Sequence, residues 1–473
     1  MQNCAILDIG KTHIKLAVLN ERYETLVSAQ CNNITVMSAP YPHVDIDGIW
    51  NWFIAQLTEI SDQYAISAIN IATHGATAAL VKASSNNDSG LLLPVIDYEW
   101  NGVEKTTDYL KLRPKFEETF SPLLPAGLNL GRQIYWLSKC YPNEFLKADA
   151  ILLYPQYWAW RMSGKMVTEI TSLGCHSDLW NVKESSFSSL VLNQKWQNKF
   201  PALCSADKPI GVVSNKFANQ TGVQKDCLIY SGLHDSNASY LRYLDGSSQA
   251  YKTIISTGTW TISFSPSTPL NRLLQSQDMD MLLNINIYGQ PIACARFMGG
   301  REYASICQQF KLDVDTNVSE SDLQQVINDE VFATPSFSNS GPFAQIKGKI
   351  IGNPKNGAAL AVLYVALLMS YELDLLDNKS EEVVISGAFV NNILLCRVFA
   401  QLRSHQKVKI CNGITGAIIG AASLCLSKKY TEVYSRDEID CHPTQLNHLV
   451  DYAKKWEQKT HEESHRISNR RVI

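Results

Sequence analysis

The chain has 473 residues, 45% of them hydrophobic and 18% charged, with a formal net charge of −3. One hydrophobic core rarely serves a chain of this length, so two domains are expected, and the composition excludes a disordered chain. Scattered charges of both signs argue against nucleic acid as a partner, because a polyanion requires a basic surface. With no long apolar run and no basic leader, we expect neither a membrane span nor a secretory signal.

The 12 cysteines are dispersed along the sequence, and none forms a C-x-x-C pair. In a long chain without a leader, this pattern favours reduced, buried thiols over a disulfide framework or a zinc site. A cytoplasmic protein is therefore expected.

The first half begins with two apolar runs at 4–7 and 14–20, which flank a polar corner at 8–13 and predict a strand, a tight turn and a second strand. A third strand, a helix with its apolar residues on one face and a β-branched strand follow at 24–31, about 47–64 and 66–73. Asp47 is the expected cap of that helix. The polar segment 84–90 predicts an exposed loop, and the aromatic residues within 154–160 are expected to pack in a core.

The second half repeats this order. A strand, a glycine-containing corner and a return strand are expected at 251–256, 257–259 and 260–264. Helices and strands then alternate at about 357–376, 383–386, about 392–403, 408–411 and 414–426, ahead of a solvated tail at 462–473. Because each half begins with strand, corner and strand, the order predicts a duplicated α/β fold that closes around a cleft.

The first corner contains Gly10-Lys11-Thr12, which is not a P-loop because Ala5 stands where that motif requires glycine. The corner can still bind phosphate, since Gly10 exposes backbone N–H groups, Thr12 offers a hydroxyl and Lys15 a cation. Asp8, at the end of the preceding strand, can hold Mg²⁺ through water. A hairpin turn without any ligand is the alternative.

Three further turns carry polar or small residues. Thr257-Gly258-Thr259 can donate two hydroxyls to phosphate or can be a plain β-turn. Asp235 follows a strand and a glycine turn, where an aspartate can serve as a general base or as a helix N-cap. The strand at 383–386 runs into Gly387-Ala388, which can admit adenine or ribose to the backbone or can serve tight packing.

Several segments, taken in chain order, resemble the motifs of one protein family. They are Asp8-Ile9-Gly10-Lys11-Thr12-His13-Ile14-Lys15, the segment 154–164, Thr168-Glu169-Ile170-Thr171, Gly232-Leu233-His234-Asp235, Ser256-Thr257-Gly258-Thr259-Trp260, Ser386-Gly387-Ala388 with Asn391, and Gly416-Ala417 with Gly420-Ala421-Ala422. Together they resemble the FGGY family of carbohydrate kinases over roughly residues 5–426. Two positions depart from the family pattern: Lys11 replaces a small residue, and Gln156 replaces an aspartate.

The resemblance implies an α/β fold of two duplicated actin-like, ribonuclease-H-like ATPase domains with a cleft between them. The sugar side, the first phosphate motif and the base would lie in a domain at 1–245, and the second phosphate and adenosine motifs in a domain at 246–430. Residues 431–473 would form a helical, polar tail. The implied cofactors are ATP and Mg²⁺, and the implied partner is a small sugar. No nucleic acid or membrane partner is expected, and formation of a homodimer stays open.

The resemblance also implies residue roles. Asp235 is the expected catalytic base, and Asp8 is the expected Mg²⁺ ligand, through water. The residues expected to bind the nucleotide are Gly10, Lys11, Thr12, Lys15, Thr257, Gly258, Thr259, Gly387, Ala388 and Asn391. The residues expected to face the sugar are His74, Gly75, Asp97, Glu99, His234, Ser236 and Asn286.

The Gly-Thr-Trp form of the second corner is most similar to the rhamnulokinase and fuculokinase branches, which favours ATP-dependent phosphorylation of a 6-deoxyketose such as L-rhamnulose or L-fuculose. Thr77 stands where those branches usually have an acid, so xylulose, ribulose, fructose or a polyol such as glycerol is an alternative substrate. A non-catalytic actin-like ATPase or sugar sensor is a further hypothesis, because a fold does not define a function. A base at Asp235 favours the kinase.

Overall fold

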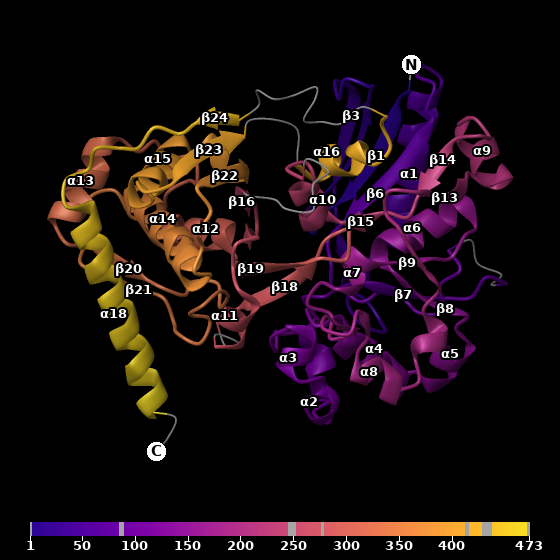
Figure 1. The fold of residues 1–473 in the computed structure, drawn as a ribbon, viewed down its shortest axis with the longest axis horizontal. Helices are drawn as coiled ribbons and strands as arrows, with labels where there is room; N and C mark the ends of the chain where they lie inside the picture. Colours follow the sequence, from indigo (N-terminus) through magenta and orange to yellow (C-terminus); the bar gives the residue numbers. More distant parts are fainter. Residues whose placement is uncertain are drawn as a thin grey trace. The chain divides into compact units, whose positions relative to one another are not determined.

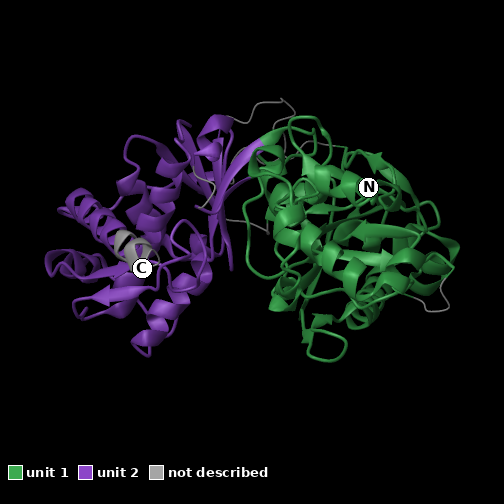
Figure 2. Cartoon of the chain, turned by 90° about the horizontal axis from the view of Figure 1, so that it is seen from below, with its two compact units in different colours: residues 1–248, 283–291, 414–435 green, residues 249–282, 292–413, 436–473 purple. Residues whose placement is uncertain are grey.

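The computed structural model describes residues 2–84, 89–244, 252–275, 279–411, 416–427 and 438–470, with side chains through residue 464. Parts of the predicted loop at 84–90 and of the predicted tail at 462–473 lie outside this description. The chain divides into two compact units (Figure 2). Unit 1 comprises Met1–Ser248, Leu283–Pro291 and Ile414–Ser435, and unit 2 comprises Gln249–Leu282, Ile292–Gly413 and Arg436–Ile473.

The main sheet of unit 1 has β1 (Cys4–Ile9) at its centre, between β2 (His13–Leu19) and β6 (Ala68–Thr73). β1 runs antiparallel to β2 and parallel to β6. Beyond them lie β3 (Thr25–Asn32) on one side and β14 (Leu228–Tyr230) with β13 (Pro209–Val212) on the other. Every residue of β6 is buried, which explains its mainly apolar and β-branched sequence, with Asn70 as the polar exception. The predicted strands and tight corner are confirmed.

Helix α1 (Ile46–Ser61) presents the predicted apolar face, with Ile49, Phe53, Leu57 and Ile60 buried. The prediction that Asp47 caps this helix is wrong, because the Asp45 carboxylate accepts the N–H of Gly48 and Asp47 lies within the first turn. Two aspartates this close satisfy the same sequence pattern, and only the backbone geometry selects between them. The aromatic residues of α6 (Tyr154–Ser163) pack in the core as predicted, with Tyr157 and Trp158 fully buried.

Unit 2 repeats the central arrangement of unit 1. β16 (Lys252–Thr257) runs antiparallel to β17 (Thr261–Ser265) and parallel to β22 (Glu382–Gly387). β23 (Lys407–Cys411) and β24 (Glu438–Asp440) follow β22, while β19 (Pro291–Phe297) and β18 (Met281–Ile285) follow β17. The duplication predicted from the order of the elements is therefore present.

Helix α14 (Gly357–Leu375) lies beside α12 (Gly299–Gln309) and α15 (Ile393–Leu402) in unit 2 (Figure 1). Its most apolar window has a mean hydropathy of 1.7, so by length and composition alone it could cross a membrane. The sequence analysis did not anticipate this, because polar residues interrupt the apolar run. Since 94% of that window is buried within the protein, we attribute the composition to packing in the core of unit 2.

Helix α16 (Gly416–Ser423), expected in the second half, packs in unit 1 against α10 (Asp235–Leu241). In Figure 1 it lies among the strands of unit 1, next to β1 and β6. A side chain at Gly420 would place its Cβ 1.7 Å from the Ala238 carbonyl oxygen, so the two helices touch backbone to backbone. The Asn70 amide also donates to the Ala421 carbonyl at 2.9 Å.

The C-terminal segment forms α18 (Leu449–Arg470) on unit 2 (Figure 1). Trp456 is buried, and its indole N–H donates to the Ala333 carbonyl at 2.8 Å. This contact precedes the solvated tail expected at 462–473 and lies within the segment 431–473 that is expected to be helical and polar. One apolar side of an otherwise charged helix is enough to hold it on the surface.

The remaining elements complete each unit. In unit 1 they are β4 (Thr35–Val36), β5 (His43–Val44), β7 (Ala78–Val81), η1 (Asn101–Lys105), α2 (Tyr109–Leu112), α3 (Phe116–Thr119), α4 (Leu130–Cys140), α5 (Pro142–Lys147), β8 (Ala150–Leu153), β9 (Thr168–Glu169), α7 (Ile170–Leu173), β10 (Trp180–Asn181), β11 (Ser186–Phe187), α8 (Ser189–Asn193), η2 (Gln197–Lys199), β12 (Leu203–Cys204), α9 (Asn215–Thr221) and β15 (Leu233–His234). In unit 2 they are α11 (Leu270–Leu274), α13 (Glu320–Asn328), β20 (Phe332–Thr334), β21 (Lys349–Ile351) and η3 (Ala388–Asn391).

Candidate active site

Asp8 lies near the end of β1, next to the tight corner that joins β1 to β2. The corner is closed by a hydrogen bond from the Gly10 N–H to the His13 carbonyl at 2.9 Å, and the Thr12 side chain is exposed. Burial and then the charge of Asp235 raise the pKa of Asp8 to about 7, while Lys15 opposes the shift. Two carboxyls and an ammonium therefore lie within electrostatic reach of one another. Hard oxygen donors of this kind suit Mg²⁺, which would relieve the repulsion between the two carboxylates.

Asp235 is the first residue of α10, directly after the short strand β15, which pairs His234 with Thr73 of β6. The N-cap of α10 is His234, so Asp235 is not the cap. Its carboxylate accepts the Ser236 N–H at 2.5 Å and the Ser236 hydroxyl at 3.1 Å. Burial raises the pKa of Asp235 to about 6, and the bonds from Ser236 oppose the shift.

His234 stands between the base and two buried neighbours. Its Nε2 is 3.3 Å from the Asp235 carboxylate and 3.7 Å from the Cys175 sulfur. The Asn237 amide donates to Nδ1 at 3.2 Å, so in a neutral ring the proton is on Nε2 and points toward Asp235. This arrangement orients one carboxylate oxygen.

The loop at 231–232, which precedes β15 and Asp235, is bonded by Gln156 of α6. Its amide nitrogen donates to the carbonyls of Ser231 and Gly232, both at 3.0 Å. Gly232 has a φ of +73°, and a Cβ there would lie 2.6 Å from Pro155, so only glycine fits. Gln156, which replaces the family's aspartate, can therefore donate two hydrogen bonds to carbonyls that an ionised aspartate, with no hydrogen to donate, could not make.

The candidate substrate turn follows β6. A Cβ on Gly75 would lie 3.1 Å from His234 Nε2, so the turn and the base are adjacent. His74 donates from Nδ1 to the Gly75 carbonyl at 2.9 Å, which leaves Nε2 as an acceptor. Burial lowers the pKa of His74 to about 4, so its ring is neutral near pH 7. Gln133 holds the turn through the carbonyl of Ala76, whose φ is +54°.

Lys11 and Asp97 form a pair that joins the first corner to this substrate side. The Lys11 ammonium is 2.5 Å from both carboxylate oxygens of Asp97 and lies over the Tyr98 ring at 5.1 Å. Asp97 also accepts from the Thr35 hydroxyl and from the Glu99 N–H. One predicted nucleotide residue and one predicted sugar residue are thus partners of each other.

For two further predicted sugar residues the structure shows contacts within their own turns. Asn286 belongs to the hairpin between β18 and β19, where its side-chain oxygen accepts the N–H groups of Tyr288 and Gln290, both at 2.9 Å. The Asn286 side-chain oxygen therefore stabilises the turn of this hairpin. The Glu99 side chain is exposed, and its backbone N–H supports Asp97.

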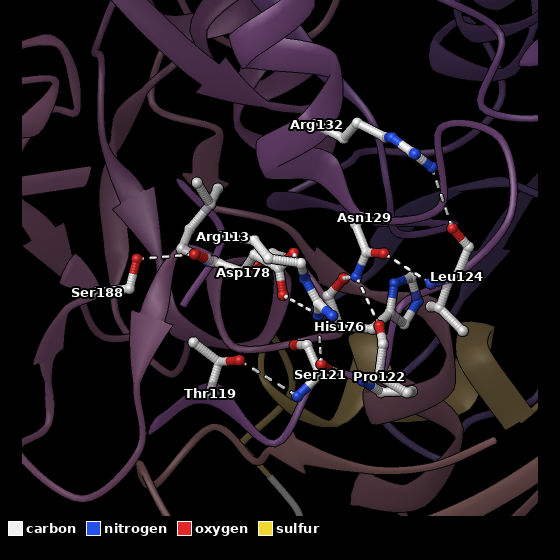
Figure 3. A network of polar contacts seen from close by, with 12 residues as sticks. Arg113, Thr119, Ser121, Pro122, Leu124, Asn129, Arg132, His176, Asp178 and Ser188 are labelled. Carbon is white, nitrogen blue, oxygen red and sulfur yellow. Dashed lines mark hydrogen bonds and ion pairs between the residues drawn. The ribbon is translucent and has the colours of Figure 1, made fainter. Parts of the chain in front are cut away.

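A buried polar network behind the base escaped the sequence analysis (Figure 3). It fixes the loop after α7, in which His176 and Asp178 have φ angles of +35° and +62°. The Arg113 guanidinium donates to both Asp178 oxygens at 3.1 and 3.2 Å, and the Asn129 amide donates to the His176 carbonyl at 3.2 Å. The same loop carries Cys175 against His234. Nothing in local spacing identifies these residues, because their partners are distant in sequence.

In unit 2, the second corner and the predicted adenosine turn lie side by side at the ends of β16 and β22. Thr257 pairs with Gly387 in the sheet, and its hydroxyl donates to the Ser386 carbonyl at 2.6 Å. That hydroxyl also accepts the Phe389 N–H at 3.0 Å, so it serves the protein's own backbone. A Cβ on Gly387 would lie 2.0 Å from the Thr257 carbonyl oxygen, which explains the glycine. Gly387, Ala388 and Asn391 are exposed.

The second corner is also supported by the start of α12, which the sequence analysis did not single out. The Gly300 N–H donates to the Gly258 carbonyl at 3.2 Å, and a Cβ on Gly300 would lie 2.6 Å from that oxygen. Trp260, directly after the corner, stacks against the Arg296 guanidinium at 4.6 Å. The pair of glycines at 299–300, ahead of an amphipathic helix, was the available sequence signal.

A chain whose two α/β units repeat the same order of strands has the fold of the actin-like class of two-domain ATPases. Family models match most of the chain: the N-terminal domain of the FGGY family of carbohydrate kinases at residues 4–241, and the C-terminal domain of the carbohydrate kinase FGGY at residues 249–433. The chain belongs to the FGGY family of carbohydrate kinases, a family of phosphotransferases.

Individual relatives are distant. The L-fuculokinase of Salmonella typhi is 23% identical over 283 residues, a match that spans 58% of this chain and 58% of that protein. A carbohydrate kinase from Novosphingobium aromaticivorans superposes with a TM-score of 0.83 at 27% identity, over 98% of this chain and 100% of that one. A ligand-bound xylulose kinase from Lactobacillus acidophilus superposes with a TM-score of 0.79 at 13% identity, over 100% and 99% of the two chains, which shows the fold alone.

Proposed function

We propose that this chain transfers the γ-phosphoryl group of ATP to a hydroxyl of a small ketose, with Asp235 as the general base. One observation carries the proposal. The Asp235 carboxyl lies at the start of α10, beside the turn that contains Gly75, and it is electrostatically coupled to Asp8. A base, a candidate metal ligand and a candidate sugar-binding turn thus come together in unit 1, as phosphoryl transfer to an alcohol requires.

In the proposed reaction, the sugar hydroxyl gives its proton to a carboxylate oxygen of Asp235 while its oxygen attacks the γ-phosphorus, and ADP leaves. The raised pKa of Asp235, about 6, makes its carboxylate an effective proton acceptor near neutral pH. His234 holds one carboxylate oxygen, so the other faces the substrate. Mg²⁺, held by Asp8 through water, would supply positive charge to the phosphates.

The nucleotide is proposed to contact both corners. Gly10, Thr12 and Lys15 would hold one end of the phosphate chain, and Gly258 and Thr259 the other. Gly387, Ala388 and Asn391 would face the adenosine, and Thr257 would support their backbone through its bond to Ser386. We also propose that the site excludes water, which could otherwise accept the phosphate.

For the sugar we propose a ketose of five or six carbons, with a 6-deoxyketose favoured. His74, Gly75, His234 and Ser236 are the proposed contacts, and Glu99 and Asn286 stay candidates. Since Lys11 is paired with Asp97, we assign both to the wall of the sugar site. The similarity to an L-fuculokinase supports the deoxyketose, whereas Thr77 leaves xylulose, ribulose and fructose as the alternative substrates. We further propose that the enzyme is cytoplasmic.

The function is tested by measuring ADP release from purified protein with Mg-ATP and a panel of ketoses, aldoses and polyols. L-Fuculose and L-rhamnulose should give the highest kcat/KM, compared with ketoses that differ only by a hydroxyl at C6. A site that pairs a hydroxyl rejects a sugar lacking it more strongly than an apolar wall rejects an added one. Preference for the hydroxylated member of each pair would exclude the deoxyketose, and no turnover with any sugar would exclude the kinase.

The role of Asp235 is tested with Asp235→Asn. Turnover should fall by about a hundredfold to ten-thousandfold, which is the usual loss for a positioned base. ATP and sugar binding, measured by calorimetry, should persist because the amide keeps the shape of the side chain. A variant with near wild-type kcat would mean that the base is elsewhere.

A further inference from the structure

A buried carboxyl lies behind the base loop without reaching the site itself. Glu169, the last residue of β9, is fully buried. Its carboxylate accepts the Thr171 hydroxyl at 2.6 Å and the Thr171 N–H at 3.0 Å. The Thr171 hydroxyl in turn accepts the backbone N–H of His234 at 3.0 Å. A chain of hydrogen bonds therefore runs from Glu169 through Thr171 to the residue directly before Asp235.

When Glu169 is ionised, the direction of each bond in this chain is fixed. A hydroxyl has one hydrogen, and the carboxylate takes it, so a Thr171 lone pair is turned toward the His234 N–H. Bonds to an ionised group are also stronger than neutral ones. His234 is the N-cap of α10 and has no side-chain cap bond, so the position of its backbone sets where the helix and Asp235 begin.

We propose that Glu169 is a positioning residue for the catalytic base and acts through Thr171. Together they hold the His234 backbone so that the Asp235 carboxylate meets the sugar hydroxyl at reaction distance. This inference rests on the proposed function of Asp235. Misplacement of a reacting group by about 1 Å can cost on the order of a hundredfold in rate, so the lost bond should appear in kcat.

A structural role alone is the competing explanation, because Glu169 also caps α7 through the Thr171 N–H. Thr168 provides the matched control. It is buried in the same strand, and within the described residues its hydroxyl makes no hydrogen bond. Thr168→Val and Thr171→Val make the same isosteric change three positions apart, but only the second breaks the chain to His234.

The experiment compares kcat, both KM values and thermal stability for Thr168→Val, Thr171→Val and Thr171→Ser. Thr171→Val should lose about tenfold to a hundredfold in kcat, with both KM values within about threefold of wild type. Thr171→Ser keeps the hydroxyl and should retain activity, and Thr168→Val should match wild type. If Thr171→Val does not fold, Thr171→Cys, whose thiol is a weak hydrogen-bonding group, takes its place with the same expected loss.

A further variant, Glu169→Gln, tests whether the Glu169 carboxyl contributes to the same positioning of Asp235. Its amide group faces two donors of Thr171 and can accept from only one oxygen, so kcat should fall here as well. Because the two residues act in series, the double variant with Thr171→Val should be no slower than Thr171→Val alone. Additive losses, or a Thr171→Val enzyme as active as Thr168→Val, would overturn the positioning role. If Asp235→Asn keeps full turnover, the proposed base fails instead.

Discussion

At the residue scale, the unusual position is Lys11. The family motif usually has a small residue there, and phosphate is the obvious partner for a lysine in such a corner. The structure instead places the ammonium on Asp97, a largely buried carboxylate, so its charge is already neutralised. A buried pair of this kind is costly to break from either side, because the remaining charge loses its partner. Lys11 therefore belongs with the proposed sugar wall.

Lys11→Met tests this assignment. The KM for sugar should rise about tenfold or more, equivalent to about 1.4 kcal/mol of lost binding free energy. The reason is that Asp97 loses its paired cation and no longer holds its position in the proposed sugar wall. The KM for Mg-ATP should stay within about twofold of wild type. Lys15→Met is the matched control on the next strand and should raise the KM for Mg-ATP. If Lys11→Met instead raised the KM for Mg-ATP and left the KM for sugar unchanged, Lys11 would be assigned to phosphate binding.

At the element scale, the base depends on neighbours that hold a strained loop and a helix start. The loop after α7 contains two residues with left-handed backbone angles, and the network of Figure 3 holds them in place. Such conformations persist only where surrounding contacts over-determine them. The middle of α10 is likewise contacted by α16, where Gly420 meets Ala238 and Gly416 meets Ser239.

Arg113→Met tests the loop network. It leaves the Asp178 carboxylate buried without its cation, which should lower the unfolding free energy by about 3–5 kcal/mol in urea denaturation. The double variant with Asp178→Asn should recover part of this loss, since no uncompensated charge remains. Arg22→Met, at an exposed arginine, should have little effect. If Arg113→Met left the urea midpoint of unfolding unchanged, the Arg113–Asp178 pair would make no net contribution to stability.

Gly420→Ala tests the contact between α16 and α10. The added methyl would overlap the Ala238 carbonyl, so the helices must separate at a cost of about 1–3 kcal/mol. The melting temperature and kcat should both fall, because α10 carries Asp235. Ser423→Ala on the same helix removes a hydroxyl whose one hydrogen bond within the described residues is to the Gly420 carbonyl, so it should change neither by much. Equal behaviour of the two variants would argue against close helix contact.

At the scale of the whole molecule, buried carboxyls make stability depend on pH. Burial raises the pKa of Glu169 from an ordinary 4.5 to about 7. The folded protein then keeps this proton to a higher pH than the unfolded chain does. The unfolding free energy should therefore decrease as the pH rises from about 4.5 to about 7, and level off above that range.

Urea denaturation of wild type and Glu169→Gln between pH 4.5 and 8 checks this dependence. The wild type should lose stability relative to the variant by about 1.4 kcal/mol for each pH unit inside the window. Comparing the two proteins cancels the titration of other groups, such as Asp8 and Asp235. A constant difference across the range would mean that Glu169 is ionised throughout.

The duplication is the other property of the whole molecule. β1, β2 and β6 in one unit correspond to β16, β17 and β22 in the other, with the same parallel and antiparallel pairings. Each central strand ends at a polar corner. The two units therefore carry equivalent corners.

The sequence by itself determined the elements around the two corners, the duplication and the family, because periodicity, strand ends and glycine turns are local signals. It also singled out Asp8, Asp235, Gly75 and Gly387, each at or just after the end of a strand. Only the tertiary structure decided which distant groups meet: Lys11 with Asp97, Glu169 with Thr171 and His234, Arg113 with Asp178, and α16 with α10. A partner tens to hundreds of residues away leaves no trace in local spacing, since its position depends on how the whole chain packs.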